Sequence, residues 1–455
     1  MADTKYDAIV VGAGAAGCAA AALLAKRGYR VALLERQSEV GGRASSFDFN
    51  GYKIDTGSHW IGSFESSGMK AIFDEVGAEI EMFNVRPTLM NFDIKTRTYA
   101  RPTSKQRLGE DSRAAYVAMR DAIRAMQPEE FSKAEYHTIS AHEWLGRLVT
   151  DPRILDAFRR STGFAGAPMK EISAGAFIET FHDAWTTDKV SSYPVKGGCV
   201  AFCQALAGRV TALGGDVMTD TSVREVIIQD GRVRGVKAMK TMAAGYAVTK
   251  FELHSDIVIC AVPGAQLFTI LEKEAISPAL RGLVEAITAE STIYFGIIAG
   301  VRAELFDGFG DGEQYFQFHA GDPDEHWHGL VTVPTYIDES LAPPGRHLVI
   351  CNSHGQLPMS RRKEGPKLHD RCINLLREVW PGRFDSHVEW LQKCEYMNVL
   401  YPARVGRSGP FRASIQPTGV GGLNICGDYT YPGGSGYGCA LKSARDVVNR
   451  IESRA

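Results

Sequence analysis

A glycine-rich turn between an apolar run and an alanine-rich segment constrains the fold of this chain more than any other feature. Residues 6–11 read YDAIVV, which is long enough for one buried strand. Residues 15–26 are rich in alanine and leucine, which favour helix, and Gly28 ends that segment. A second apolar run, residues 30–34, leads into Glu35. This order of strand, turn, helix, strand and acid predicts a dinucleotide-binding unit.

The turn carries the pattern G-x-G-x-x-G over residues 12–17. Gly12 permits a tight turn, Gly14 lets a pyrophosphate approach the backbone, and Gly17 allows the helix and the strand to pack closely. The N-terminus of the helix adds free N–H groups and a partial positive charge. An ordinary glycine-rich turn is the alternative, but it does not require the second strand and the terminal acid.

A second glycine pair indicates which dinucleotide is bound. Glu35, about twenty positions after Gly14, can accept hydrogen bonds from an adenosine ribose, and Arg36 adjoins it. Residues 41–43 then read GGR. An NAD enzyme has no need of this pair, whereas the flavin half of FAD must be held along the same groove.

Three further segments complete the pattern. Residues 55–60 read DTGSHW, residues 424–428 read NICGD, and residues 431–438 read YPGGSGYG. Together with the N-terminal unit they resemble the FAD-dependent amine oxidase and phytoene desaturase superfamily, and within it the phytoene dehydrogenase-like branch of carotenoid desaturases and isomerases. The resemblance implies an α/β fold, in which a Rossmann-type FAD-binding domain of the glutathione-reductase-like kind is interleaved with an α+β substrate domain.

The resemblance also implies roles for individual residues. The backbone of Val223 would meet the adenine, and Asp428 would bind the ribityl or pyrophosphate region. Asp428 could instead be an ordinary turn acid, and Arg43 a solvated charge. Neither Cys426 nor Cys439 lies in the family's flavin attachment motif, so we expect FAD to be bound non-covalently. The predicted cofactor-binding residues are Gly12, Gly14, Ala15, Ala16, Gly17, Glu35, Arg36, Gly41, Gly42, Arg43, Gly57, Ser58, His59, Val223, Gly427, Asp428, Gly434 and Ser435.

The length of 455 residues exceeds what one core usually holds, so two domains are expected. We assign residues 1–95, 190–285 and 402–455 to the FAD-binding domain, and residues 96–189 and 286–401 to the substrate domain with a helical cap. The turn residues Asn50 and Gly51 indicate a hairpin. Helices are expected at residues 69–76, 113–126, 154–161, 367–379 and 438–450. A further helix is expected to open with residues 193–198 and to run to residue 213, and a strand is expected at residues 90–99.

Composition and motif content give no support for several other classes of protein. The 51 basic and 53 acidic residues are balanced, which gives no reason to expect nucleic acid as a partner. The nine cysteines contain no CxxC pair and no metal-ligand spacing with histidine. We found no signal peptide and no apolar run of membrane-spanning length, so a cytoplasmic location is expected, with peripheral membrane contact left open. No pattern indicates an oligomeric state.

Candidate catalytic residues follow from the chemistry of a flavin. In a desaturation, one carbon loses a hydride to flavin N5 and the neighbouring carbon loses a proton. Removal of the proton can require a base. His59 is the candidate base, with a structural histidine as the alternative. Tyr437 is a second candidate, and a packing or hydrogen-bonding role suits it better. The predicted pocket residues are Trp60, Trp185, Tyr294, Phe316, Phe318 and Tyr437, with His319 as a further candidate.

The sequence therefore predicts an FAD-dependent dehydrogenase that desaturates a CH–CH bond of a mostly apolar small molecule, which could be alicyclic, terpenoid or carotenoid-like. Dioxygen or a quinone would reoxidise the flavin. Three alternatives stay open at this point. They are a flavin amine oxidase, a redox-neutral flavin-dependent isomerase and a non-catalytic prenyl-binding escort protein.

Overall fold

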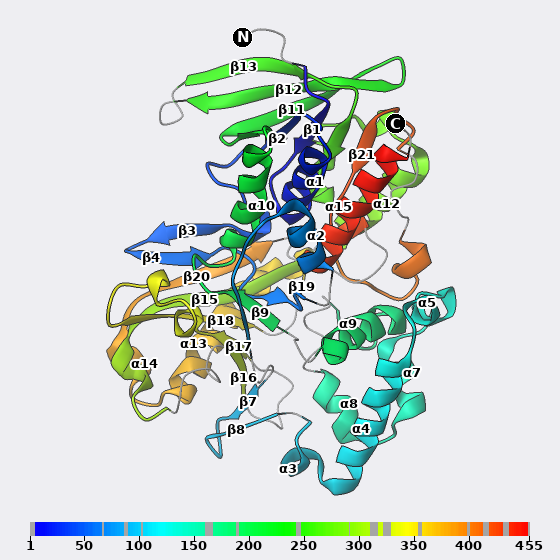
Figure 1. Cartoon of the computed structure of the whole chain (residues 1–455). Helices are drawn as coiled ribbons and strands as arrows, with labels where there is room; N and C mark the ends of the chain where they lie inside the picture. Colours follow the sequence, from blue (N-terminus) through cyan, green and yellow to red (C-terminus); the bar gives the residue numbers. More distant parts are fainter. Residues whose placement is uncertain are drawn as a thin grey trace.

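The computed structural model describes residues 5–65, 68–85, 90–101, 103–159, 167–187, 191–242, 247–290, 292–309, 317–321, 329–353, 357–397, 401–412, 418–430 and 436–453. Two sheet domains and a helical cap make up these residues, as Figure 1 shows. In the described part of the chain, no helix is both long and apolar enough to cross a membrane.

The first domain is a parallel sheet with the strand order β10-β2-β1-β14-β21. Every residue of β1 and β2 is buried, because layers cover both faces of the sheet. The antiparallel sheet β11-β12-β13 contributes its apolar side chains to the same core. The strands are β1 (Ala8–Val11), β2 (Val31–Leu34), β10 (Asp216–Met218), β14 (Val258–Cys260), β21 (Leu423–Ile425), β11 (Thr221–Gln229), β12 (Arg232–Met242) and β13 (Ala247–His254). This parallel α/β sheet confirms the predicted fold class.

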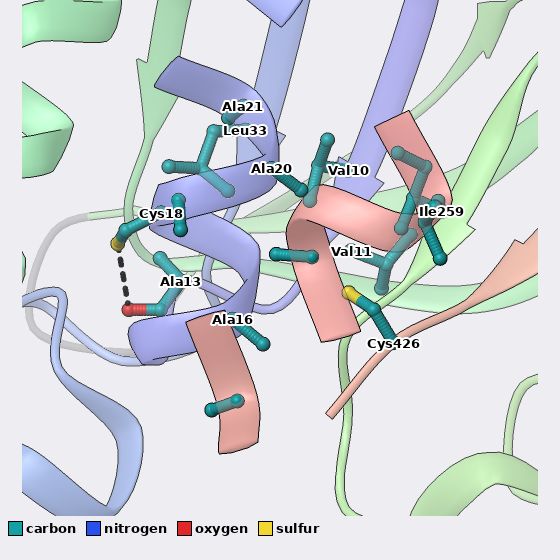
Figure 2. Close-up of a cluster of buried hydrophobic side chains, with 14 of the residues drawn as sticks. Val10, Val11, Ala13, Ala16, Cys18, Ala20, Ala21, Leu33, Ile259 and Cys426 are labelled. Atoms are coloured by element: carbon teal, nitrogen blue, oxygen red, sulfur yellow. Dashed lines mark hydrogen bonds between the residues drawn. The ribbon is translucent and has the colours of Figure 1, made fainter. Parts of the chain in front are cut away.

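Helix α1 (Ala15–Lys26) packs closely on this sheet because its side chains are small. Figure 2 shows Ala20 and Ala21 of α1 beside Leu33 and Val10 of the sheet. Helices α10 (Val200–Ala212) and α15 (Tyr437–Glu452) flank α1, and α2 (Met69–Val76) lies beside them. This surrounding layer explains why nearly all of α1 is buried and why it carries no polar stripe.

The second domain is built on a larger sheet with the strand order β19-β15-β18-β17-β16-β7-β8, in which β20 also pairs with β15. Helix α13 (Gly365–Val379) covers one face with apolar side chains. The strands are β7 (Met90–Asp93), β8 (Thr98–Ala100), β15 (Thr292–Arg302), β16 (Gln317–Gly321), β17 (Gly329–Thr332), β18 (Arg346–Ser353), β19 (Leu357–Pro358) and β20 (Val388–Met397). Since β7 pairs with β16, the domain boundary expected near residue 95 lies before Met90.

The cap is helical, as expected, and has a core of its own. Its helices are α3 (Lys105–Leu108), α4 (Glu110–Ala125), α5 (Pro128–Phe131), α6 (Ala134–His137), α7 (Ala141–Leu148), α8 (Pro152–Arg159) and α9 (Ala174–Thr187). Helix α9 lies nearest to the sheet domains in Figure 1.

Several local predictions are confirmed and others are wrong. The hairpin of β3 (Ser46–Phe49) and β4 (Tyr52–Asp55) turns at Asn50 and Gly51, both with positive φ. Residues 90–99 are not one strand, because Arg97 has a φ of 57° and the chain turns back there. Tyr193 lies in a strand rather than at a helix start. The remaining elements are β5 (Ile61–Gly62), β6 (Met82–Asn84), β9 (Ser191–Pro194), α11 (Gly264–Leu267), α12 (Pro278–Ala289) and α14 (Phe384–His387).

Candidate active site

A large cavity of ≈ 1160 Å³ is lined by residues of both sheet domains and of the cap helix α9. It passes the carboxyl ends of β1, β2, β14 and β21, where ligands bind in open α/β sheets. Most of the predicted site residues line it. They are Gly12, Gly14, Ala15, Ala16, Glu35, Arg36, Gly41, Gly42, Arg43, Gly57, Ser58, His59, Trp60, Val223, Tyr294, Gly427, Asp428 and Tyr437.

Other predicted residues lie elsewhere. Gly17 does not line the cavity, and a Cβ there would overlap the carbonyl oxygen of Gly12, so Gly17 serves helix–strand packing. The assignment of Phe318 to the pocket is wrong, because its ring packs against Phe92 on the face that α13 covers. Trp185 is also not a pocket residue, because its ring packs in the cap core, 4.9 Å from that of Phe181. Phe316, Gly434 and Ser435 lie outside the described residues.

Glu35 joins the end of β2 to the glycine turn. One carboxylate oxygen accepts the Ala13 backbone N–H at 2.9 Å, and the other accepts the Gln37 backbone N–H at 3.0 Å. Its side chain is buried and still borders the cavity. The predicted bond from Glu35 to a ribose stays a prediction, and the structure adds a second role, since the carboxylate also holds the turn in place.

The glycines around the turn let three backbone segments meet. A Cβ on Gly42 would lie 3.2 Å from the Cα of Gly14, and one on Gly57 would lie 2.7 Å from the Arg43 carbonyl oxygen. A Cβ on Gly14 would instead meet nothing nearer than the Gly41 carbonyl oxygen, at 3.9 Å. It would therefore project into the cavity, where the free N–H groups at the start of α1 can bind an anion. These features form a cradle that fits a pyrophosphate.

Arg43 and Asp428 form a bidentate ion pair. The guanidinium nitrogens Nη2 and Nη1 of Arg43 donate to the two carboxylate oxygens of Asp428 at 2.7 Å and 3.2 Å. Burial opposes the charge of Arg43, but the attraction of Asp428 prevails and raises the pKa of Arg43. The two predicted cofactor residues thus act together at the junction of the first and last parts of the nucleotide domain.

His59 is buried in the wall of the cavity. Its side chain is 6% exposed, and neither ring nitrogen has a hydrogen-bond partner among the described residues. Burial lowers the pKa of His59 to about 4, so the imidazole is neutral above that pH. Its ring meets that of Tyr396 edge to face, with 5.4 Å between the ring centroids. A neutral imidazole in the wall of a cavity is a candidate proton acceptor for a substrate that reaches a ring nitrogen.

Tyr437, the first residue of α15, also lines the cavity. Burial raises the pKa of its hydroxyl well above the ordinary value. Its phenolate is therefore disfavoured near neutral pH, which argues against the predicted catalytic role as a base. The ring lies 5.1 Å from that of Phe202 and is suited to shaping the cavity.

The sequence interpretation missed the role of Asp55, although it singled out the DTGSHW segment. The buried carboxylate of Asp55 accepts hydrogen bonds from Tyr193 Oη at 2.7 Å, Ser46 Oγ at 2.8 Å and the Cys199 backbone N–H at 2.9 Å. Burial raises the pKa of Asp55, and these donors oppose that rise. Asp55 thereby anchors the segment that carries His59.

The cap contributes charged groups to the same cavity. Glu179 and Asp183 lie one turn apart on α9 and both line it. Lys442 of α15 reaches both, with its Nζ 3.3 Å from Glu179 Oε1 and 3.9 Å from Asp183 Oδ2. No local pattern indicated this cluster, because its members come from two distant segments.

Comparison with known proteins identifies the class. Residues 15–451 match the family of flavin-containing amine oxidoreductases, and the chain belongs to that family. It is therefore a flavin-dependent oxidoreductase, and its cofactor is FAD. The match confirms the resemblance expected from the glycine motifs. Non-covalent attachment of FAD stays a prediction.

Two distant relatives align with nearly the whole chain. The zeta-carotene-forming phytoene desaturase of Myxococcus xanthus is 24% identical over 507 residues, which cover 97% of this chain and 93% of that protein. The chloroplastic prolycopene isomerase of Arabidopsis thaliana is 23% identical, over 99% of this chain and 85% of that protein. An oxidoreductase structure from Methanosarcina mazei superposes with a TM-score of 0.75 at 21% identity, over 97% of this chain and 99% of that chain.

Proposed function

We propose that this protein is an FAD-dependent dehydrogenase that desaturates a CH–CH bond of a mostly apolar small molecule. Its substrate would be alicyclic, terpenoid or carotenoid-like. The similarity to a phytoene desaturase over nearly the whole chain supports this choice within the family. So does the wall of the cavity around His59, where Tyr294, Tyr396 and Leu330 supply aromatic and aliphatic surface.

The observation that carries the proposal is the state of His59. A desaturation releases one proton from carbon, and a base with a pKa far above neutrality would already be protonated. His59 is neutral, buried and without a partner among the described residues. It can therefore take the proton at its free ring nitrogen.

The remaining residues hold the reactants in place. These residues would hold FAD, which would supply the acceptor for the hydride from the adjacent carbon. The glycine cradle at Gly14 and Gly42 would bind the pyrophosphate, while Trp60 and Tyr437 border the space beside the DTGSHW segment. Asp55 keeps that segment fixed through its three hydrogen bonds. We propose dioxygen or a quinone as the final electron acceptor.

The test follows the flavin absorbance of the purified holoprotein under anaerobic conditions while candidate substrates are added. Bleaching by an alicyclic, terpenoid or carotenoid-like compound, with a product two hydrogens poorer, is the expected result. His59→Gln should slow flavin reduction about a hundredfold, which is within the usual range for a general base. The variant His347→Gln is the matched control, because His347 bonds to Thr335 Oγ1 at 2.9 Å and does not line the cavity.

Three results would contradict the proposal or a part of it. If His59→Gln reduces its flavin as fast as the wild type, the proton leaves by another route. If no compound bleaches the flavin, but the chemically reduced protein rearranges a double bond, the activity is that of a redox-neutral isomerase. A purified protein that takes up no FAD would favour the escort-type alternative.

Amine oxidation is a second candidate that one observation favours. Glu179 and Asp183 present two carboxylates to the cavity, which would attract a cationic amine, although Lys442 offsets part of their charge. Hydrogen peroxide release is the discriminating measurement. Release with amines, together with bleaching by amines alone, would replace the desaturase proposal.

A further inference from the structure

We propose that a buried cluster of His137, Ser173 and Ser408 holds the cap against the segment 401–412 and thereby positions one wall of the cavity. His137 ends α6, Ser173 precedes α9, and Ser408 lies in the segment. The three side chains are positioning residues, because they stand behind the wall and none of them lines the cavity. The inference goes beyond the proposed function, since it concerns the shape of the cavity and holds for any reaction that takes place there.

The polar atoms of the cluster bond to one another in the protein interior. His137 Nδ1 lies 2.8 Å from Ser408 Oγ and 3.3 Å from Ser173 Oγ, and Ser408 Oγ donates to Ser173 Oγ at 2.6 Å. Both serines are fully buried, and His137 is 3% exposed. A buried hydrogen bond is costly to break, because the partner left behind stays unsatisfied. The cluster therefore fixes the three segments relative to one another.

The ring of His137 fits closely against two glycines. A Cβ on Gly175 of α9 would lie 2.4 Å from the imidazole, and one on Gly409 would lie 2.3 Å from it. Gly409 also has a φ of 58°, which disfavours residues with a side chain. One glycine belongs to the cap and the other to the segment 401–412. The two parts of the chain are thus shaped to receive this ring between them.

Backbone hydrogen bonds continue the contact on both sides of the cluster. The Ser173 N–H donates to the Ala403 carbonyl oxygen at 3.0 Å, and the Gly406 N–H donates to the His137 carbonyl oxygen at 2.8 Å. These bonds join the same two parts of the chain as the side chains do. The cap is therefore docked on the segment 401–412 at a defined position.

The cluster lies directly behind the wall of the cavity. Ile172 and Ala176, on either side of Ser173 in the chain, both line the cavity. Ser173 Oγ also accepts the Ala176 N–H at 3.2 Å, so the hydroxyl that belongs to the cluster holds the first turn of α9. The predicted FAD-binding residues all lie outside the cap. A displaced Ser173 would move both wall residues and widen the cavity.

The segment 401–412 also touches the cofactor site. The ring of Tyr401 lies 5.4 Å from that of Tyr429, and the Arg43 guanidinium lies 6.0 Å from the centroid of the Tyr401 ring. Arg43 is the partner of Asp428 in the bidentate ion pair. The segment therefore connects the cofactor-binding pair to the cap, and the cluster sets where the cap wall stands relative to the cofactor.

The experiment measures access to the cavity in the oxidised holoprotein and needs no substrate. Dithionite is added under anaerobic conditions, and the bleaching of the bound flavin is followed by its absorbance. Ser408→Ala removes the hydroxyl that bonds to both other members of the cluster. We expect the flavin of this variant to bleach several times faster, because the displaced wall admits the reductant. Hydrogen exchange of the 172–178 amides should be about tenfold faster, which is the effect of one lost buried hydrogen bond.

A second variant and a matched control complete the test. Gly175→Ala displaces the His137 ring and leaves every polar group in place, so it should act in the same direction as Ser408→Ala. Thr335→Val is the control. Thr335 Oγ1 bonds to His347 Nδ1 at 2.9 Å and accepts the Leu348 N–H at 3.3 Å, in a buried site that does not line the cavity. Its replacement should leave the rate of bleaching and the exchange of the 172–178 amides at wild-type values.

The proposal is overturned if Ser408→Ala bleaches at the wild-type rate, even where its amides exchange faster, because the cluster would then serve stability alone. An equal effect of Thr335→Val would overturn it as well. If Gly175→Ala does not fold, Ser408→Ala decides by itself. Since neither readout involves a substrate, failure of the proposed desaturation leaves this inference intact, and failure of this inference leaves the proposed reaction intact.

Discussion

The protonation state of His59 depends on how deeply its side chain is buried. His59 lies in the cavity wall between the flavin-binding segment and Tyr396, and burial alone lowers the pKa of its imidazole to about 4. In the unfolded chain the pKa of histidine is near 6.5. The folded protein therefore binds a proton at His59 less tightly than the unfolded chain does. At any pH where the unfolded chain is protonated at this residue, the free energy of unfolding is lowered.

We therefore expect His59 to make stability depend on pH. Its contribution is fully present above pH 6.5 and is lost as the pH falls through about 4. The two pKa values correspond to a loss of about 3 kcal/mol in the free energy of unfolding between pH 7 and pH 4. Denaturant unfolding at several pH values measures it, with His59→Gln as the comparison. If that variant loses as much stability as the wild type over this range, the burial effect is absent.

At the scale of the element, the glycines of the first turn have different tasks although they share one motif. Gly14 lines the cavity, and a Cβ added there would not clash with any atom of the protein. Gly17 faces the turn, where an added Cβ would overlap the Gly12 carbonyl oxygen. The same substitution at the two positions should therefore separate cofactor binding from folding.

Gly14→Ala should leave the stability of the apoprotein nearly unchanged and weaken FAD binding at least tenfold, because the methyl group occupies the cradle. Gly17→Ala should lower the stability of the apoprotein by about 3 kcal/mol or more, because α1 must move away from the turn. Denaturant unfolding of the apoproteins and titration with FAD measure the two effects. An apoprotein of Gly14→Ala as unstable as that of Gly17→Ala would contradict this division of roles.

At the scale of the whole molecule, the cavity is closed by parts that are distant in sequence. Lys442 of α15 reaches Glu179 and Asp183 of α9, and so connects the nucleotide domain to the cap. Burial raises the pKa of Asp183, and Lys442 opposes that rise. The ion pairs are partly exposed, so their contribution to stability is expected to be below about 1 kcal/mol.

Lys442→Met should loosen the cap without unfolding the nucleotide domain. We expect faster hydrogen exchange of the α9 amides and unchanged exchange in β1 and β2. Lys273→Met is a matched control, because Lys273 forms a surface ion pair with Glu285 at 3.0 Å away from the cavity. Equal exchange of α9 in both variants would show that Lys442 does not hold the cap.

FAD should also stabilise the molecule as a whole, because its site exists only when the segments before and after the substrate domain are folded together. At a free FAD concentration one hundred times the dissociation constant, the expected gain is about 2.7 kcal/mol. Thermal unfolding with and without added FAD measures it. A melting temperature that does not respond to FAD would contradict the predicted cradle.

The sequence by itself determined the parts in which function depends on local backbone geometry. The glycine turn, Glu35 and the GGR segment require particular backbone conformations, so their residue types show directly in the sequence. Together with residues 55–60, 424–428 and 431–438 they predicted the fold class and FAD, and they supplied the candidate residues around the cradle. The helical cap was also predictable, since helix formation depends on local composition.

The wall that meets the substrate was decided only by the tertiary structure. Phe318 and His319 are adjacent in β16, but the register of the sheet turns Phe318 into the α13 core and His319 to the opposite face. Lys442 became a candidate only when α15 met α9. Such side chains acquire their role from neighbours that are far away in sequence. Pairing register and helix docking, which no local pattern specifies, therefore decide what this cavity can bind.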